Sequence, residues 1–210
     1  MANTNAPFGF RPARHVSGLG HRLNAYLIAS ALAETIAVGD LVKSDSSGGI
    51  QKAGAADAIL GVFAGWSLST QGLGVANYSG SANATIPFNK VWTSGTTLAT
   101  GQTAIAWVHD DPSETFIAQT SQTLAITAIG AFVDLVDASP NTLFGASRQT
   151  VGAVGGATFR VERIIEQSQR TVDSNNNTVG WGLSGAGQYA VVELKPVKHE
   201  RAGATAGVAV

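Results

Sequence analysis

The chain has no cysteine among its 210 residues, and this absence excludes several kinds of chemistry. Without thiols there is no disulfide framework, no cysteine nucleophile and no cysteine-based metal site. Charged residues are also scarce, at 13% of the chain, against about 25% in an ordinary soluble domain. The formal net charge is -1, so composition gives no electrostatic reason to expect nucleic-acid binding.

Long apolar runs are missing as well. No run approaches the ~18 residues that a membrane-spanning helix needs, and the N-terminal residues lack the hydrophobic core of a signal peptide. We therefore expect synthesis in the cytoplasm and no membrane association. Small residues take the place of charges, including 25 glycines. Small side chains suit tight β-turns, close strand packing and surfaces that neighbouring subunits cover.

Short segments rich in β-branched and aromatic residues recur along the chain, separated by turn sequences. The expected strands are 23–29, 41–44, 50–53, 59–66, 84–88, 91–92, 104–109, 115–119, 132–136, 158–165 and 188–195. Residues 41–44 and 50–53 are expected to pair as a hairpin across a glycine-containing loop. A second hairpin is expected between 104–109 and 115–119, because 110–113 is a strong turn sequence.

Three further segments are not clear strands. Residues 31–37 contain good helix formers but are too short to form a helix alone. Residues 124–136 fit a loose helical period and also a turn followed by a strand after Gly130, which is the interpretation we favour. Residues 147–157 are expected to be a connector punctuated by glycines.

These features predict an all-β fold, a compact antiparallel β-barrel or sandwich that is jelly-roll-like, with an extended N-terminal arm and little helix. Barrel and sandwich both remain open at this point. The expected organisation is an extended arm over 1–22, a single β-rich body over 23–200 and a flexible small-residue tail over 201–210.

The arm is unlike the start of a globular domain. Its two prolines favour extended backbone, and no helical or alternating period passes through it. Fully extended, fifteen such residues reach roughly 50 Å. A partner surface that takes the rings and the cations would explain the composition, whereas the alternative is a frayed terminus with a local aromatic tuck. The expected partner-binding residues are Pro7, Phe8, Phe10, Arg11, Pro12, Arg14 and His15.

Three motifs suggest chemistry but lack the context that it needs. Residues 180–185 match G-x-G-x-x-G, but a loop precedes them and a strand follows, so they predict a glycine-rich turn rather than a phosphate-binding loop. Residues 173–177 begin like a calcium loop, but Thr178 and Ser184 replace the required glycine and carboxylate. The carboxylates at 110–111 precede a proline, which indicates a hairpin tip rather than a catalytic pair.

Other candidate catalytic groups are equally isolated. The four histidines show no short metal-ligand spacing, and no serine lies in a G-x-S-x-G sequence. The four tryptophans are expected to be core or subunit-interface anchors, with a sugar-binding platform as the minor alternative: Trp66, Trp92, Trp107 and Trp181. We therefore expect no enzymatic activity, no metal and no cofactor.

The N-terminal motif resembles the start of a family of tailed-phage virion proteins, the capsid decoration or cement proteins. The motif is Ala6-Pro7-Phe8-Gly9-Phe10-Arg11-Pro12, followed by Arg14 and His15. Further segments agree in order: 39–43, 59–65, 108–112 with Phe116 and Gln119, Gly130 with Asp134 and Leu135, and 192–194 with His199. The resemblance covers most of the chain, and its N-terminal motif is the most specific part.

The resemblance implies a non-enzymatic structural protein on the outer face of an icosahedral phage head, where it cements neighbouring major-capsid subunits. It implies a β-rich fold, association as a homotrimer, and the major capsid protein as partner. The expected location is therefore the outer capsid surface of the virion. The alternatives are a head-fibre base or tail structural component and, less favoured, a glycan-binding module.

Overall fold

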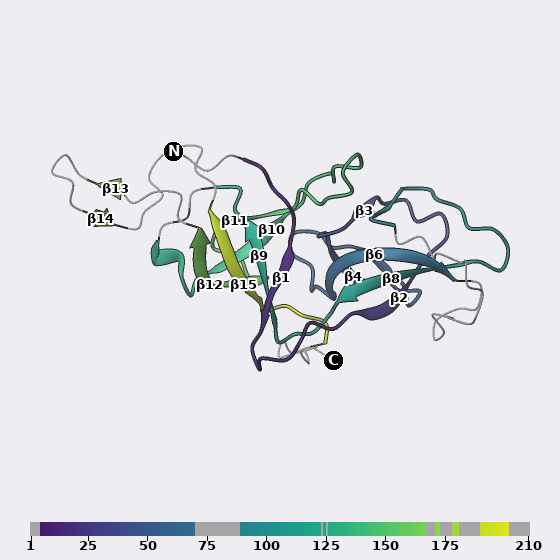
Figure 1. Ribbon diagram of the computed structural model, residues 1–210, viewed down its shortest axis with the longest axis horizontal. Coiled ribbons are helices and arrows are strands. Elements are labelled where there is room, and N and C mark those ends of the chain that lie inside the picture. The colour runs from purple at the N-terminus through teal and green to yellow at the C-terminus, as the bar shows by residue number, and fades with distance from the viewer. Residues whose placement is uncertain are drawn as a thin grey trace.

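The computed structural model describes residues 5–69, 89–122, 124, 126–166, 171–172, 178–180 and 190–201. The chain forms two large antiparallel sheets, one toward each end of the long axis (Figure 1). This confirms the all-β prediction, and the open sheets fit a sandwich rather than a closed barrel. Within the described residues the one helical element is a single 3-10 turn, Ile126–Ala128, and no helix is long and apolar enough to cross a membrane.

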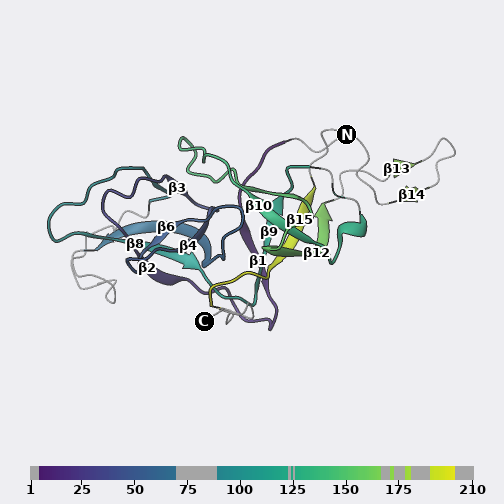
Figure 2. The ribbon, with the colours of Figure 1, turned by 180° about the vertical axis from the view of Figure 1, so that it is seen from behind.

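The larger sheet has six strands. Their order is β1 (Arg11–His15), β9 (Glu114–Gln119), β15 (Val191–Pro196), β12 (Phe159–Glu166), β10 (Phe132–Val136) and β11 (Thr150–Val154). Figure 2 shows this sheet from behind, at the end of the molecule away from β2, β4, β6 and β8.

The second large sheet has five strands, and two small sheets accompany the pair. The five-stranded order is β2 (Asn24–Ile28), β8 (Thr103–His109), β6 (Gly61–Ser69), β4 (Leu41–Ser44) and β5 (Ile50–Lys52). The small sheets are β3 (Ile36–Ala37) with β7 (Val91–Trp92), and β13 (Thr171–Val172) with β14 (Thr178–Gly180).

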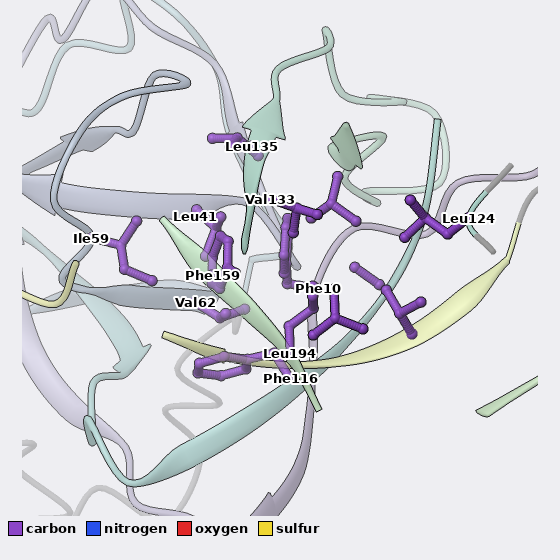
Figure 3. Packing of buried hydrophobic residues seen from close by; sticks show 14 of the residues in the cluster. Phe10, Leu41, Ile59, Val62, Phe116, Leu124, Val133, Leu135, Phe159 and Leu194 are labelled. Atoms are coloured by element: carbon purple, nitrogen blue, oxygen red, sulfur yellow. The ribbon is translucent and has the colours of Figure 1, made fainter. Parts of the chain in front are cut away.

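Two hydrophobic clusters form the core. The first lies against the six-stranded sheet and includes Phe10, Phe116 and Phe159 (Figure 3). Leu41 and Val62, from strands of the other sheet, also belong to it, so the two sheets share this cluster.

The second cluster lies against the five-stranded sheet and contains two of the expected tryptophan anchors. The rings of Trp66 and Trp92 meet edge to face, with centroids 5.0 Å apart. The indole of Trp66 donates a hydrogen bond to the carbonyl of Val91 at 2.7 Å. Both tryptophans are therefore core residues, which removes them from any sugar-binding platform.

One of the two expected hairpins is correct. Strands β4 and β5 pair as predicted. The second hairpin is wrong, because β8 pairs with β2 and β6 whereas β9 pairs with β1 and β15. The turn at 110–113 instead carries the chain from one sheet to the other. A turn sequence specifies a reversal but not a partner, and the apolar faces of these two strands enter different clusters.

Two less regular segments are also resolved. The turn followed by a strand predicted for 124–136 is confirmed by the 3-10 turn and β10. The connector expected over 147–157 is wrong, because it contains β11, which pairs with β10 through a bulge. Val151 is buried in the first cluster, which explains why a strand forms here. The glycines around it interrupt the alternation by which the strand could have been predicted. Four expected features lie outside the described residues: the strand at 84–88, the motif at 173–177, the motif at 180–185 after its first residue, and the tail after 201.

Candidate functional site

The N-terminal segment lies along the body of the protein from Ala6 onward. The backbone N–H of Ala6 donates to Gln119 Oε1 at 3.1 Å, and that of Phe10 donates to the carbonyl of Gly39 at 2.8 Å. Gly9 has a φ of +72°, and a Cβ there would lie 2.3 Å from the Cβ of Ser147. Only glycine satisfies both the backbone conformation and the close approach.

This glycine separates the two rings of the motif. Phe10 turns inward, is 1% exposed and stacks on Phe159 with centroids 5.3 Å apart. Phe8 stays half-buried at the surface, where the Arg11 guanidinium lies 4.8 Å from its ring centroid. The prediction that Phe10 anchors a partner is therefore wrong, and the alternative of a local aromatic tuck describes this ring.

The rest of the motif forms an edge strand. Residues Arg11–His15 pair with β9, so this part of the expected arm is extended, as predicted, but belongs to the six-stranded sheet as an edge strand. Pro12 is tolerated because an edge strand leaves one row of amides unpaired, and a bulge follows it. The His15 side chain is 6% exposed and lies 3.1 Å from Asp111. Of the predicted contact residues, the most exposed are therefore Arg11 and Arg14, and their binding to a partner stays a prediction.

A carboxylate that sequence reasoning did not single out sits beside Arg14. Glu193 of β15 has a fully buried side chain that accepts hydrogen bonds from Arg14 Nε at 2.5 Å, from Thr115 Oγ1 at 2.7 Å and from Arg163 Nε. Burial alone would raise the pKa of Glu193, but these hydrogen bonds and the two arginines outweigh it and lower the pKa. The two arginines themselves remain 55% and 59% exposed.

Glu193 marks the centre of a cationic surface. Strand alternation turns Phe116, Leu194 and Phe159 toward the core, so their direct neighbours along β9, β15 and β12 face outward. Bulges after Pro12 in β1 and after Val161 in β12 shift the alternation, so that Arg14 and Arg163 reach the outward side beside Glu193. We call the outward cations of these strands and of β1 the arginine face: Arg11, Arg14, Arg160, Arg163 and Lys195. The clear alternation at 158–165 predicted the charged side of β12, but no local pattern predicted that β1 belongs to the same sheet.

A second exposed feature is the tip of the β10–β11 loop, drawn green above the two sheets in Figure 1. Leu143 is 84% exposed and Phe144 is 70% exposed, the two largest values among the described large hydrophobic residues. Asn141 Oδ1 accepts their backbone N–H groups at 3.1 and 3.3 Å, and two backbone hydrogen bonds join Asn141 to Ala146. The tip is thus a closed turn that holds two apolar side chains in water, a feature typical of interaction sites.

The turn between β8 and β9 forms a buried polar junction instead of the hairpin tip expected there. Asp110 accepts hydrogen bonds from Asn24 Nδ2 at 2.7 Å and from Tyr26 and Arg201. These donors come from a strand of the five-stranded sheet and from the segment that follows β15, so the carboxylate ties the two sheets together. Burial, followed by the hydrogen bond to Asp110, raises the pKa of Tyr26.

The histidines gather at the same junction. Glu114 Oε1 lies 3.2 Å from His21 Nδ1, and its other oxygen lies 3.7 Å from His109 Nδ1. His199 is 5% exposed and its Nδ1 accepts the backbone N–H of Arg201. Burial lowers the pKa of His109 and of His199 and raises the pKa of Glu114. Together with His15 on Asp111, all four histidines of the chain take part.

A groove of about 560 Å³ lies beside β4 and β5. Its two lysines are already paired, since Lys43 lies 2.7 Å from Asp57 and Lys52 lies 2.6 Å from Asp137. Its other charged group, Glu34, accepts the backbone N–H of Lys52 at 2.7 Å. In the part of the chain that the structure describes, no group of three or more His, Cys, Asp or Glu side chains is arranged to hold a metal ion. The exposed candidates are therefore the arginine face and the Leu143–Phe144 tip.

The chain matches no family model, no curated protein and no solved structure. A functional assignment therefore rests on the residues and surfaces of the chain itself. The features that bear on it are the N-terminal motif, the arginine face beside that motif and the exposed loop tip.

Proposed function

We propose that the chain is a structural virion protein that binds the outer face of an icosahedral phage head and cements neighbouring major-capsid subunits, acting as a homotrimer. One observation carries the proposal. The N-terminal motif that resembles capsid decoration proteins is fixed on the body so that Phe8, Arg11 and Arg14 lie together at an open edge of the six-stranded sheet. Aromatic and arginine side chains are the residues enriched in protein–protein interfaces.

Because the motif is anchored, the proposed mechanism is binding of the shell by a preformed sheet edge rather than by a free arm. Gly9 and Phe10 hold the segment in place, so docking of Phe8 and the arginines costs less conformational entropy than docking of a flexible arm. In a trimer, three such edges contact the shell at once, and the second and third bind at a millimolar-scale effective concentration. Weak single contacts then resist the separation of neighbouring capsomers.

The Leu143–Phe144 tip supplies a second apolar contact in this proposal. A closed turn presents both side chains without a large ordering cost, and full burial of each against a partner contributes about 2 kcal/mol. The loop that carries the tip also contacts the motif, because its Ser147 packs against Gly9.

The test is quantitative peptide counting on purified virions of the phage that encodes the chain, taken against the major capsid protein. We expect a molar ratio near one or a simple fraction such as one third. A ratio of a few per cent would replace the proposal with a head-fibre base or a tail component. Complete absence from virions would overturn it and would make glycan binding the next function to test.

A further inference from the structure

Arg14 and Arg163 each bind Glu193 through one N–H donor and have further donors left. Both Arg14 and Arg163 donate to it through Nε, from opposite sides and to different oxygens. A guanidinium carries four further N–H donors on its two Nη atoms. Among the described residues, Glu193 is the one hydrogen-bond partner of the Arg14 and Arg163 side chains, so two pairs of Nη donors remain beside a single carboxylate.

The hydrogen bonds to Glu193 also fix the direction of these donors. A free surface arginine loses about 2 kcal/mol of rotamer entropy when a partner orders it. Here a fully buried carboxylate, itself held by Thr115, has already ordered both side chains at their Nε atoms. The outward Nη groups therefore form a prepared fork of the kind that binds carboxylates with two parallel hydrogen bonds.

The surroundings favour an acidic protein surface over nucleic acid. The arginine face holds five cations, but Glu162 and Glu193 lie among them, and the Glu162 carboxylate already binds Arg160 at 2.7 Å. Carboxylates inside the cationic surface repel a continuous phosphate backbone, which needs many cations in register. Phe8 beside Arg11 adds an aromatic contact at the margin, as in protein interfaces.

We propose that the arginine face is a docking surface for a carboxylate-bearing protein surface, with the outward Nη groups of Arg14 and Arg163 as the central recognition pair. This inference rests on the proposed function only in naming the capsid shell as the owner of the carboxylates. The Glu193 contacts then serve as an internal template: the carboxylate holds the arginines in the geometry that the partner requires.

The test replaces both arginines by lysine, as Arg14→Lys with Arg163→Lys. Each lysine keeps a positive charge for Glu193, so the buried carboxylate is not left unpaired, but the forked donors are lost. The matched control is Arg22→Lys with Arg148→Lys, two exposed arginines outside the face. Binding is measured in two ways: co-sedimentation with shells stripped of the protein, and fluorescence anisotropy with a labelled peptide rich in Asp and Glu. A thymidine oligonucleotide of equal charge is the competitor.

We expect the double variant in the face to weaken binding to shells and to peptide by about tenfold, with the control pair unchanged. Unchanged binding by the face variant would overturn the inference while the proposed function stands. Peptide binding that depends on the two arginines, without shell binding by the wild type, would support the inference and overturn the proposed function. Stronger binding of the oligonucleotide than of the peptide, or no wild-type binding to either probe, would overturn the docking surface.

Discussion

Gly9 is the residue on which the placement of the N-terminal motif depends. Gly9→Ala places a Cβ 2.3 Å from Ser147 and 2.7 Å from the carbonyl of Gly39, in addition to the cost of a positive φ. We expect a loss of about 3 kcal/mol in the free energy of unfolding, measured by urea denaturation. Gly18 is the matched control, because its φ is +75° but no atom lies within 4 Å.

Gly18→Ala therefore reports the backbone cost alone, about 1 kcal/mol. Equal losses in the two variants would show that the segment is not packed against Ser147. The two glycines look alike in the sequence, since each lies in a polar or aromatic stretch near the N-terminus. Their difference is set by a residue more than a hundred positions away, so no local pattern predicts it.

Asp40 gives a second prediction at the scale of one residue. Its side chain is fully buried, and burial raises its pKa to about 6 despite the hydrogen bond from the backbone N–H of Ala37. Because the folded pKa lies above the ordinary value of 3.8, the native state binds more protons, and the stability that the protonated form provides is lost as the pH rises through about 6.

Asp40→Asn removes this ionisation while keeping an acceptor for Ala37. We expect the free energy of unfolding of the variant, taken relative to that of the wild type, to be about 2 kcal/mol higher near pH 7.5 than near pH 4. Denaturant titration at both pH values measures this difference. A stability difference that does not change with pH would contradict a raised pKa at this site.

At the scale of elements, the pairing of β1 with β9 distinguishes the observed N-terminal segment from a free arm. Its hydrogen bonds to β9 predict slow amide exchange at the paired positions of Arg11–His15 in the isolated protein. Leu19 and Gly20 are exposed, and no backbone hydrogen bond joins their amides to another described residue, so they serve as fast-exchanging references. Hydrogen exchange followed by NMR would contradict the edge strand if β1 exchanged as fast as these two residues.

The two phenylalanines of the motif are expected to contribute to different properties, Phe10 to the stability of the fold and Phe8 to shell binding. Phe10→Ala removes a ring from the first cluster and should cost 3–5 kcal/mol of stability, at about the level of other buried aromatic truncations. Phe8→Ala should leave the melting temperature nearly unchanged and weaken shell binding, because its ring is half-buried and lies at the surface beside Arg11. Calorimetry and co-sedimentation measure the two effects, and full shell binding by a folded Phe8→Ala variant would remove Phe8 from the interface.

Individual strands could be predicted from the sequence, but the pairing between them could not. Period-two alternation predicted strands such as β12, because alternate burial is a local property of a strand. The pairing of β9 with β1 and β15 was not predictable, since the turn before β9 joins two sheets and pairing depends on distant contacts. The same limit applies to the candidate site. Arg14 and Arg163 lie far apart in the sequence, and the fold brings both into contact with Glu193.

At the scale of the whole molecule, the two sheets are joined by a core and by charges. The first cluster takes apolar side chains from both sheets, as Figure 3 shows for Leu41 and Val62 beside Phe159. The polar junction takes its groups from the β1–β2 connector, the β8–β9 turn and the segment after β15. Three of the connections between sheets therefore meet around two buried carboxylates, Asp110 and Glu114.

This junction predicts how the protein responds to acid. Burial lowers the pKa of His109 and of His199, so the unfolded state binds more protons than the native state as the pH falls below about 6.5. The stability that the neutral histidines provide is present above that pH and is lost as the pH falls through their folded pKa values. The raised pKa values of Glu114 and Asp40 act in the opposite direction, so the wild-type pH profile alone does not isolate the histidines.

The double variant His109→Gln with His199→Gln isolates them, because glutamine stays neutral and keeps polar atoms at both positions. We expect the variant to lose less unfolding free energy than wild type between about pH 7.5 and pH 5.5, measured by urea denaturation at each pH. Asp40→Asn should change the same slope with the opposite sign, which makes it the control. Parallel pH profiles for wild type and the histidine variant would show that the junction does not respond to acid through these two side chains.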